Sequence, residues 1–357
     1  NTAANPFTIY LSGTPTGWSN TGTYSWDLIS AASLTGFSSG NFSWNFDNFG
    51  IAGGNRTGTW AFTNPSGGNI TLTYTLATPD YIWDGGSGNW TDSYSAGVRG
   101  FTPANPTAND NLYFTGSGGT VTNTMANSTI SSVNFITFNS TAGAYTLNST
   151  TGAAGVSGGT PLTVTGDIIN NSASNQAISM NLALGGSSTG TINTAAGNIT
   201  ISGVISGTGG LTKEGNRTLT LSAANTFSGV TTVNNGTLVL SGQPTTGSLV
   251  INSGATVNAG LNTLTSISSV TINGGTLTPG HFLRSFAGAL TMTNGSISAG
   301  GDFAAGSYTL YGNNTIATTI SDRGATFNVV SGTTTISGAI TFLWGGNLIK
   351  NGNGTLT

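Results

Sequence analysis

The sequence predicts an all-β protein in which a β-sandwich-like N-terminal domain precedes a parallel β-helix, or β-solenoid. Three observations support this prediction. Thr, Ser, Asn and Gly dominate the composition, with 56 glycines in 357 residues, and such side chains favour strands and turns over helices. Short apolar runs alternate with polar residues, as in Leu219, Thr220 and Leu221, which is typical of half-buried strands. A period of roughly 20 residues runs through the C-terminal part.

Composition also excludes several classes of protein. Hydrophobic residues make up 36% of the chain, which argues against disorder. Charged residues make up only 5%, the net charge is −3 and no basic cluster occurs, so nucleic acid is not expected as a partner. Apolar stretches are too short for a transmembrane segment. The chain has no cysteine and therefore no disulfide framework.

Aromatic residues divide the chain into parts. We expect residues 1–79 to form a separate aromatic-rich β domain, residues 80–196 an opening module with the first β-helix rungs, and residues 197–357 solenoid repeats that stop in mid-repeat. Six aromatics of the first part alternate with polar residues, which favours one buried sandwich face over a glycan or subunit interface. They are Trp18, Tyr24, Trp26, Trp44, Phe46 and Trp60.

The repeats are marked by an apolar residue followed three positions later by a turn residue. Because a unit of this length cannot bury its own apolar face, neighbouring units must stack. The predicted turn column consists of Gly236, Gly254, Gly275, Gly295, Asn313, Gly332 and Gly352. The predicted buried ladder beside it consists of Val233, Ile251, Ile272, Met292, Leu310, Val329 and Ile349.

Four segments carry a family resemblance. Residues 209–240 read GGLTKEGNRTLTLSAANTFSGVTTVNNGTLVL, and a second, interrupted copy at 346–357 reads GNLIKNGNGTLT. Upstream, WDGGSGNW at 83–90 and NLYF at 111–114 are similar to a module that precedes such repeats. The chain thus resembles bacterial surface proteins with autotransporter-associated β-strand repeats. The resemblance implies a right-handed β-helix, export and a place outside the cell or on its surface, and it implies no reaction.

We therefore expect an extracellular structural protein, either the subunit of a surface fibre or filament or part of a stalk-like adhesin. The alternative is a β-helix enzyme or binding protein that acts on polysaccharides. We expect no catalytic residue, cofactor site or metal site. General acid–base work needs paired groups, and the solenoid acids Asp167, Glu214, Asp302 and Asp322 are scattered.

Some side chains nevertheless need to be weighed for chemistry. Asp302 and Asp322 are 20 residues apart and could stack in adjacent rungs, although Arg323 offers Asp322 a surface ion pair. His281 follows a Pro-Gly turn, which predicts a loop position. The threonine pairs Thr218/Thr220 and Thr333/Thr335 could bind ice if they were stacked in columns, but the sequence shows no repetition of the pairs at one position.

Two further motifs invite a functional interpretation. Asp80, Asp84 and Asp92 lie near two glycines, but their spacing fits a structural turn better than a calcium loop. Sequons for asparagine-linked sugars are abundant, as expected of a composition rich in Asn, Ser and Thr, and they are weak glycosylation candidates. They occur at Asn41, Asn55, Asn69, Asn89, Asn127, Asn139, Asn148, Asn170, Asn198, Asn216, Asn235, Asn294, Asn313 and Asn353.

The expected partners are other copies of the chain and glycans. An unfinished last rung would leave an unpaired strand edge, which further repeats or a neighbouring molecule would continue. The segment with Phe7, Ile9 and Leu11 on one face is the best candidate for a donated strand. Such head-to-tail contacts would generate a filament.

Overall fold

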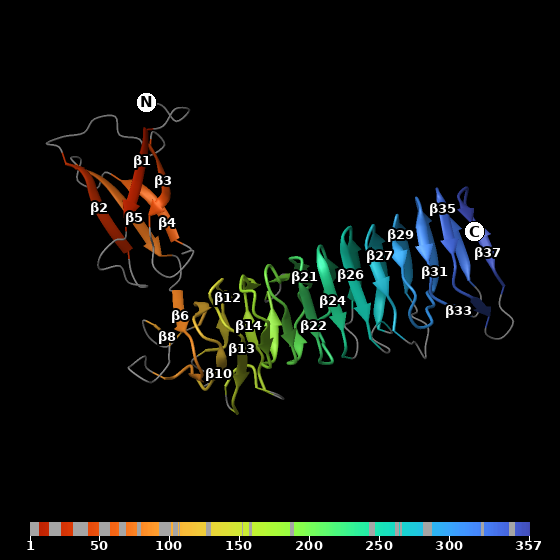
Figure 1. Ribbon diagram of the computed structural model, residues 1–357, viewed down its shortest axis with the longest axis horizontal. Coiled ribbons are helices and arrows are strands. Elements are labelled where there is room, and N and C mark those ends of the chain that lie inside the picture. The colour runs from red at the N-terminus through yellow and green to blue at the C-terminus, as the bar shows by residue number, and fades with distance from the viewer. Residues whose placement is uncertain are drawn as a thin grey trace. The chain divides into compact units, whose positions relative to one another are not determined.

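The protein is described by a computed structural model (Figure 1). The structure describes residues 7–13, 23–30, 42–49, 58–63, 69–76, 80–92, 101–102, 106, 108–125, 130–151, 153–156, 159–185, 189–242, 247–260, 264, 266–280, 288–322, 325–342 and 347–357. Within this part every regular element is a β-strand, so the prediction of an all-β fold is confirmed. No helix that could cross a membrane occurs in the same residues.

Two compact units make up the chain, one formed by residues 1–82 and 102–104 and the other by residues 83–101 and 105–357. The first unit contains two small sheets. Parallel strands β1 and β3 form one, and β2, β5 and β4 form an antiparallel sheet in that order. The strands are β1 (Phe7–Gly13), β2 (Thr23–Ser30), β3 (Phe42–Phe49), β4 (Gly58–Thr63) and β5 (Asn69–Leu76).

The second unit is a β-solenoid whose rungs appear as a row of parallel arrows in Figure 1. One long sheet has 14 strands: each rung adds one strand beside the last, and one further short strand, Phe101–Thr102, lies at the edge beside Asp80–Asp84. In chain order they are β6 (Asp80–Asp84), β8 (Phe101–Thr102), β9 (Asn111–Thr115), β12 (Ile136–Phe138), β15 (Ile168–Asn170), β18 (Gly190–Asn193), β21 (Leu211–Glu214), β23 (Thr231–Val233), β25 (Gly247–Asn252), β27 (Ile267–Asn273), β29 (Ala289–Thr293), β31 (Ser307–Tyr311), β34 (Thr326–Val329) and β37 (Ile349–Asn351).

The other long sheet has 13 strands and is formed by the second strand of each rung. Its members are β7 (Gly88–Asn89), β10 (Gly119–Asn123), β13 (Tyr145–Ser149), β16 (Gln176–Ile178), β19 (Ile199–Ile201), β22 (Thr218–Leu221), β24 (Gly236–Leu240), β26 (Ala255–Ala259), β28 (Thr276–Thr278), β30 (Ser296–Ile297), β32 (Asn314–Ile316), β35 (Thr333–Ile336) and β38 (Thr355–Leu356). The short corner between each pair of strands therefore recurs once per rung.

Two shorter sheets complete the solenoid. One contains β11 (Ser132–Val133), β14 (Leu162–Val164), β17 (Leu182–Leu184) and β20 (Ile205–Ser206), and the other contains β33 (Ile320–Asp322) and β36 (Ile340–Phe342). The four-stranded sheet belongs to the earlier rungs, before most of the repeats of roughly 20 residues. There Ile136 pairs with Ile168 and Ile168 with Ile192, so the rungs are longer than those farther along the chain.

Apolar side chains fill the interior of the solenoid because successive residues of a strand point to opposite faces. Trp83 and Trp90 of the opening module are completely buried, and the indole Nε1 of Trp83 donates a hydrogen bond to the carbonyl of Gly86 at 3.0 Å. Phe114 stacks on Phe138 with ring centroids 5.2 Å apart. These large rings fill the first rungs, while branched aliphatic residues fill most of the later ones.

Candidate functional site

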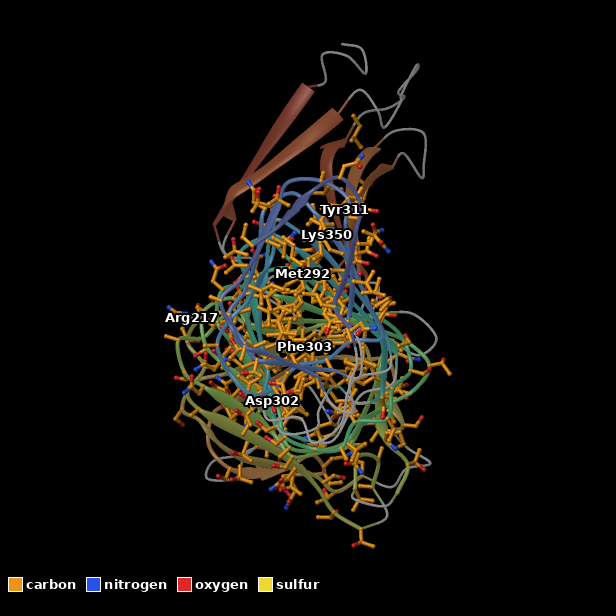
Figure 2. The ribbon with its side chains drawn as sticks, turned by 90° about the vertical axis from the view of Figure 1, so that its right-hand side faces the viewer. Arg217, Met292, Asp302, Phe303, Tyr311 and Lys350 are labelled. Atoms are coloured by element: carbon orange, nitrogen blue, oxygen red, sulfur yellow. The ribbon has the colours of Figure 1, made fainter. Side chains whose placement is uncertain are left out.

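One inward column of the 14-stranded sheet confirms most of the predicted ladder. The register joins Val233, Ile251, Ile272, Met292, Leu310 and Val329 in consecutive rungs, and all six are buried. Figure 2, a view along the stack, shows Met292 inside the ring of ribbon and Arg217 at its outer edge.

The prediction that Ile349 is the seventh member of this ladder is wrong. Ile349 pairs with Thr326 and leaves 49% of its surface exposed. Lys350, its neighbour, pairs with Phe327, which is buried. The error came from counting back three residues from Gly352. In the strand as it forms, Lys350 and not Ile349 is the residue that pairs with the inward Phe327.

The predicted turn positions lie at the corner between the two long sheets, but three of them are displaced by one residue. A positive φ occurs at Gly236, Gly254, Gly332 and Gly352 as expected. In three other rungs it occurs one residue earlier than predicted, at Gly274, Asn294 and Gly312. Corner length does not account for the displacement: Val233 and Thr237 are four residues apart, as are Ile272 and Thr276, yet the positive φ comes three residues after Val233 and two after Ile272.

A buried lysine closes this corner in the rung of β21. Lys213 pairs in register with Ile192 and Val233, so it occupies the inward column, and its side chain is 0% exposed. Its Nζ donates hydrogen bonds to the carbonyl oxygens of Glu214 at 2.9 Å, Gly215 at 2.7 Å and Asn235 at 2.9 Å. Gly215 has a φ of 78°. The ammonium group therefore ties two neighbouring rungs together.

Burial has a cost for this ammonium group. Desolvation lowers the pKa of Lys213 to about 8, and the negative charge of Glu214 partly opposes that shift. The Glu214 carboxylate in turn accepts hydrogen bonds from the side-chain amides of Asn234, at 2.5 Å, and Asn235, at 3.3 Å. Charge and hydrogen bonds at this corner therefore form one network across the two rungs.

The network continues along the outside of the sheet as an asparagine ladder. Asn252 Nδ2 donates to Asn234 Oδ1 at 2.7 Å, and Asn273 Nδ2 donates to Asn252 Oδ1 at 3.3 Å. Each bond joins one rung to the next. Amide side chains suit this position because each has both a donor and an acceptor.

The second copy of the repeat reproduces part of the lysine arrangement. Lys350 Nζ donates to the carbonyl of Gly352 at 2.7 Å, and Gly352 has a φ of 80°. Lys213 and Gly215 stand in the same relation. Both lysines of the chain are followed two residues later by glycine. This repeated Lys-x-Gly pattern is the signal by which sequence reasoning, which missed the buried lysine, could have found it.

Hydroxyl side chains form a column on the outer face of the 13-stranded sheet. Register joins residues of seven consecutive rungs, namely Thr218, Thr237, Thr256, Thr276, Ser296, Thr315 and Thr335. The expectation that the threonine pairs do not repeat at one position holds, because Thr335 and not Thr333 lies in the column of Thr218, whereas single hydroxyl residues do repeat there. The parallel column two residues farther along each strand is less regular, because Thr220 is followed there by Val239 and Asn258 in the next two rungs.

The candidate catalytic acids are not brought together. Phe303 forms a bridge with Ile320, so the parallel register places Asp322 two residues beyond that bridge and Asp302 one residue before it. The two acids therefore occupy different positions along the rung, which corrects the idea that they stack. His281 and Arg323, and the side chain of Asp322, lie outside the described residues.

One acid of the opening module stabilises a turn. The Asp92 carboxylate accepts a hydrogen bond of 2.7 Å from the backbone N–H of Asn89, while Asp84 is exposed. Among the residues that the structure describes, no group of three or more His, Cys, Asp or Glu side chains could hold a metal ion. The side chain of Asp80 is not described.

The proposed donor segment is part of a sheet within its own unit. Phe7 pairs with Phe42 and Ile9 with Trp44 in the parallel register of β1 and β3, and Leu11 lies between Tyr10 and Ser12, where that register shifts. Donation would require this sheet to open. The side chains of the N-terminal aromatics lie outside the described part, as does Trp18 altogether.

The sequon asparagines have different environments. Asn170 is 0% exposed, and its Nδ2 donates to the carbonyls of Ser174 at 2.9 Å and Asn198 at 3.1 Å. Asn139, Asn148 and Asn198 are half-buried. Six others are exposed: Asn89, Asn216, Asn235, Asn294, Asn313 and Asn353. Asn41, Asn55 and Asn127 and the side chain of Asn69 are not described.

Comparison with known proteins agrees with the repeat pattern. The family model of the passenger-associated-transport-repeat matches residues 211–240, the segment that contains Lys213 and four strands from β21 to β24. The predicted autotransporter-associated β-strand repeat is thereby confirmed. No solved structure matches the chain.

A curated relative covers more of the chain. The adhesin BmaC autotransporter of Brucella suis biovar 1 (strain 1330) is 31% identical over 229 residues, which correspond to 60% of this chain. The chain spans only 6% of the length of that relative. The similarity therefore concerns a small part of a far longer protein.

Proposed function

We propose, from the passenger-associated-transport-repeat that this chain carries, that it is an exposed segment of a bacterial surface adhesin with a structural, stalk-like role. The observation that carries the proposal is that the matched residues 211–240 fold into registered rungs of the solenoid. The relative named as an autotransporter adhesin supports the same role.

The chemistry of the solenoid suits an exposed spacer. Each rung is held to the next by backbone hydrogen bonds, so its stability is approximately a sum of nearest-neighbour terms and length can grow without a larger core. The outer columns of Thr and Asn offer hydrogen bonds with little charge. Any adhesive contact of this surface, including one to glycans, would therefore depend weakly on salt.

A fibre subunit is the second form of this proposal. The pairing of β1 with β3 favours the stalk over a donor-strand fibre, because a donated strand would first have to leave its own sheet. Deleting residues 1–11 tests the fibre: light scattering and microscopy should show the same particles with and without the segment. Loss of filaments on deletion would establish the donor strand instead.

We also propose that the role is non-enzymatic. Asp302 and Asp322 occupy different positions along the rung, and Glu214 is engaged by two asparagine amides. Purified chain incubated with a panel of acidic and neutral polysaccharides should release no new reducing ends. Release that depends on one of these acids would support the polysaccharide-cleaving alternative.

Location is tested on the producing bacterium. Antibodies raised against the folded chain should label intact cells, and adding the purified chain should reduce attachment of those cells to their natural surface. Labelling that appears only after the cells are permeabilised would contradict a surface adhesin. Labelling without any effect on attachment would leave the stalk and remove the adhesive role.

A further inference from the structure

Four sequon asparagines occupy one equivalent position along the solenoid. Thr218, Thr237, Ser296 and Thr315 belong to a single registered column, and each is the hydroxyl residue of a sequon. The asparagine of each sequon lies two residues earlier, at the corner between the long sheets. These are Asn216, Asn235, Asn294 and Asn313, which we call the corner asparagines.

All four corner asparagines are exposed. The two rungs that separate Asn235 from Asn294 carry Gly254 and Gly274 at the same position, two residues before Thr256 and Thr276. The sequons thus come in two pairs of adjacent rungs. Within each pair the rungs are about 4.8 Å apart, the separation of hydrogen-bonded strands.

The hydrogen bonds of the corner asparagines leave a modified nitrogen compatible with the fold. Asn294 Oδ1 accepts from the backbone N–H of Asn313 at 2.9 Å, and Asn313 Oδ1 accepts from that of Thr333 at 3.1 Å. A sugar attached to Nδ2 keeps Oδ1 as an acceptor. Asn235 Nδ2 donates one hydrogen to Glu214, and the substituted amide would retain one.

We propose that the corner asparagines are a column of sites for asparagine-linked sugar. In the modification, Nδ2 bonds to the anomeric carbon of an activated sugar phosphate. The bond from that carbon to the phosphate oxygen breaks, the phosphate ester leaves with the electron pair, and Nδ2 gives up one proton. Only 17 of 357 residues are charged, so sugars along an exposed corner would add solvation that the protein surface lacks.

Asn170 supplies the matched control within the same chain. It lies in a sequon, but its side chain is buried and both Nδ2 hydrogens serve internal carbonyls. A sugar there would remove one of these bonds and would need space inside a packed rung. The folded protein should therefore carry sugar at the corner and none at Asn170, whether modification precedes or follows folding.

The test is glycopeptide mass spectrometry of the protein isolated folded from its producing bacterium. We expect added sugar at one or more corner asparagines, with at most one of Asn294 and Asn313 occupied in most molecules, and none at Asn170. Sugar at no corner asparagine, or equal occupancy at Asn170, would overturn the proposal.

One variant separates modification from folding. Thr315→Ala destroys one sequon and leaves the Asn313 side chain in place, so sugar at Asn313 should disappear while the far-ultraviolet circular dichroism is unchanged. Persistence of sugar at Asn313 would refute the sequon assignment. The added mass distinguishes the donors, because a preassembled oligosaccharide indicates a lipid-linked donor and a single sugar indicates a nucleotide-linked one.

Discussion

Ile272 offers the most direct test of the buried ladder. It is 0% exposed and lies in register between Ile251 and Met292. We consider Ile272→Val, Ile272→Ala and Ile272→Asp, with Thr271→Ala as the matched control on the same strand. Thr271 is half-buried on the outer face, so its replacement changes the same backbone without opening the core.

The expected losses follow from what each change removes. Ile272→Val should lower the free energy of unfolding by about 1 kcal/mol, and Ile272→Ala by about 2–5 kcal/mol because a cavity is left between two rungs. Ile272→Asp should cost several kcal/mol more than valine, since a carboxylate is buried without a partner. Thr271→Ala should stay within about 0.5 kcal/mol of the parent.

Urea unfolding followed by circular dichroism measures these differences. Because solenoid rungs are coupled mainly to their neighbours, the weakest variant should also show a broader or divided transition. Equal midpoints for Ile272→Asp and the parent, or an equal loss for Thr271→Ala and Ile272→Ala, would refute an inward position for Ile272.

Three further predictions concern the corner and its contacts. Burial lowers the pKa of Lys213 to about 8 in the folded protein, against its ordinary value of 10.5. The unfolded chain therefore binds more protons than the folded protein between these values, and the free energy of unfolding should rise as the pH increases from about 8 towards 10.5. Urea midpoints should show this rise in the parent and not in Lys213→Met. Glu214→Gln removes the charge that raises this pKa, and nuclear magnetic resonance of the lysine side chain should show titration at a still lower pH. Gly254→Ala should cost about 1 kcal/mol, because a φ of 81° is unfavourable but a Cβ meets no atom within 4 Å. Gly242→Ala should cost more, towards the upper end of roughly 1–3 kcal/mol for overpacking, because its Cβ would lie 1.9 Å from the carbonyl oxygen of Ala223; equal melting temperatures for these two variants would contradict the close approach of the rungs.

The sequence predicted the repeating part of the fold because one period controls both burial and turns. Alternating residues identify Val233, Ile251 and Ile272 as inward, since side chains of a strand alternate between faces. Asn and Gly mark the corner because both tolerate a positive φ. These local rules need no knowledge of distant contacts.

The features that the sequence did not predict depend on differences between individual rungs, which an average period does not contain. The left-handed residue comes two positions after the inward residue in some rungs and three in others, so a fixed spacing assigned three turn positions one residue late. Lys213 was overlooked because lysine is rarely buried, and its carbonyl partners come from the corners of two rungs. The structure places Thr218 and Thr237 in one column. The sequence does not determine this register, because strands with two threonines offer two alternative alignments.

Spin-label distances test the registered stack most directly. The chain has no cysteine, so two cysteines can be introduced and spin-labelled, one at an outward position of β21 and one at an outward position of β31. Thr212 and Thr309 lie in one column, joined through Thr232, Val250, Thr271 and Thr291. Electron–electron double resonance should give a separation near 24 Å between labels at Thr212 and Thr309, five steps of about 4.8 Å. Moving the first label from Thr212 to Val250 should shorten the separation to about 14 Å, three such steps. Distances that do not decrease in proportion to the number of rungs would contradict the solenoid on which the proposed function rests.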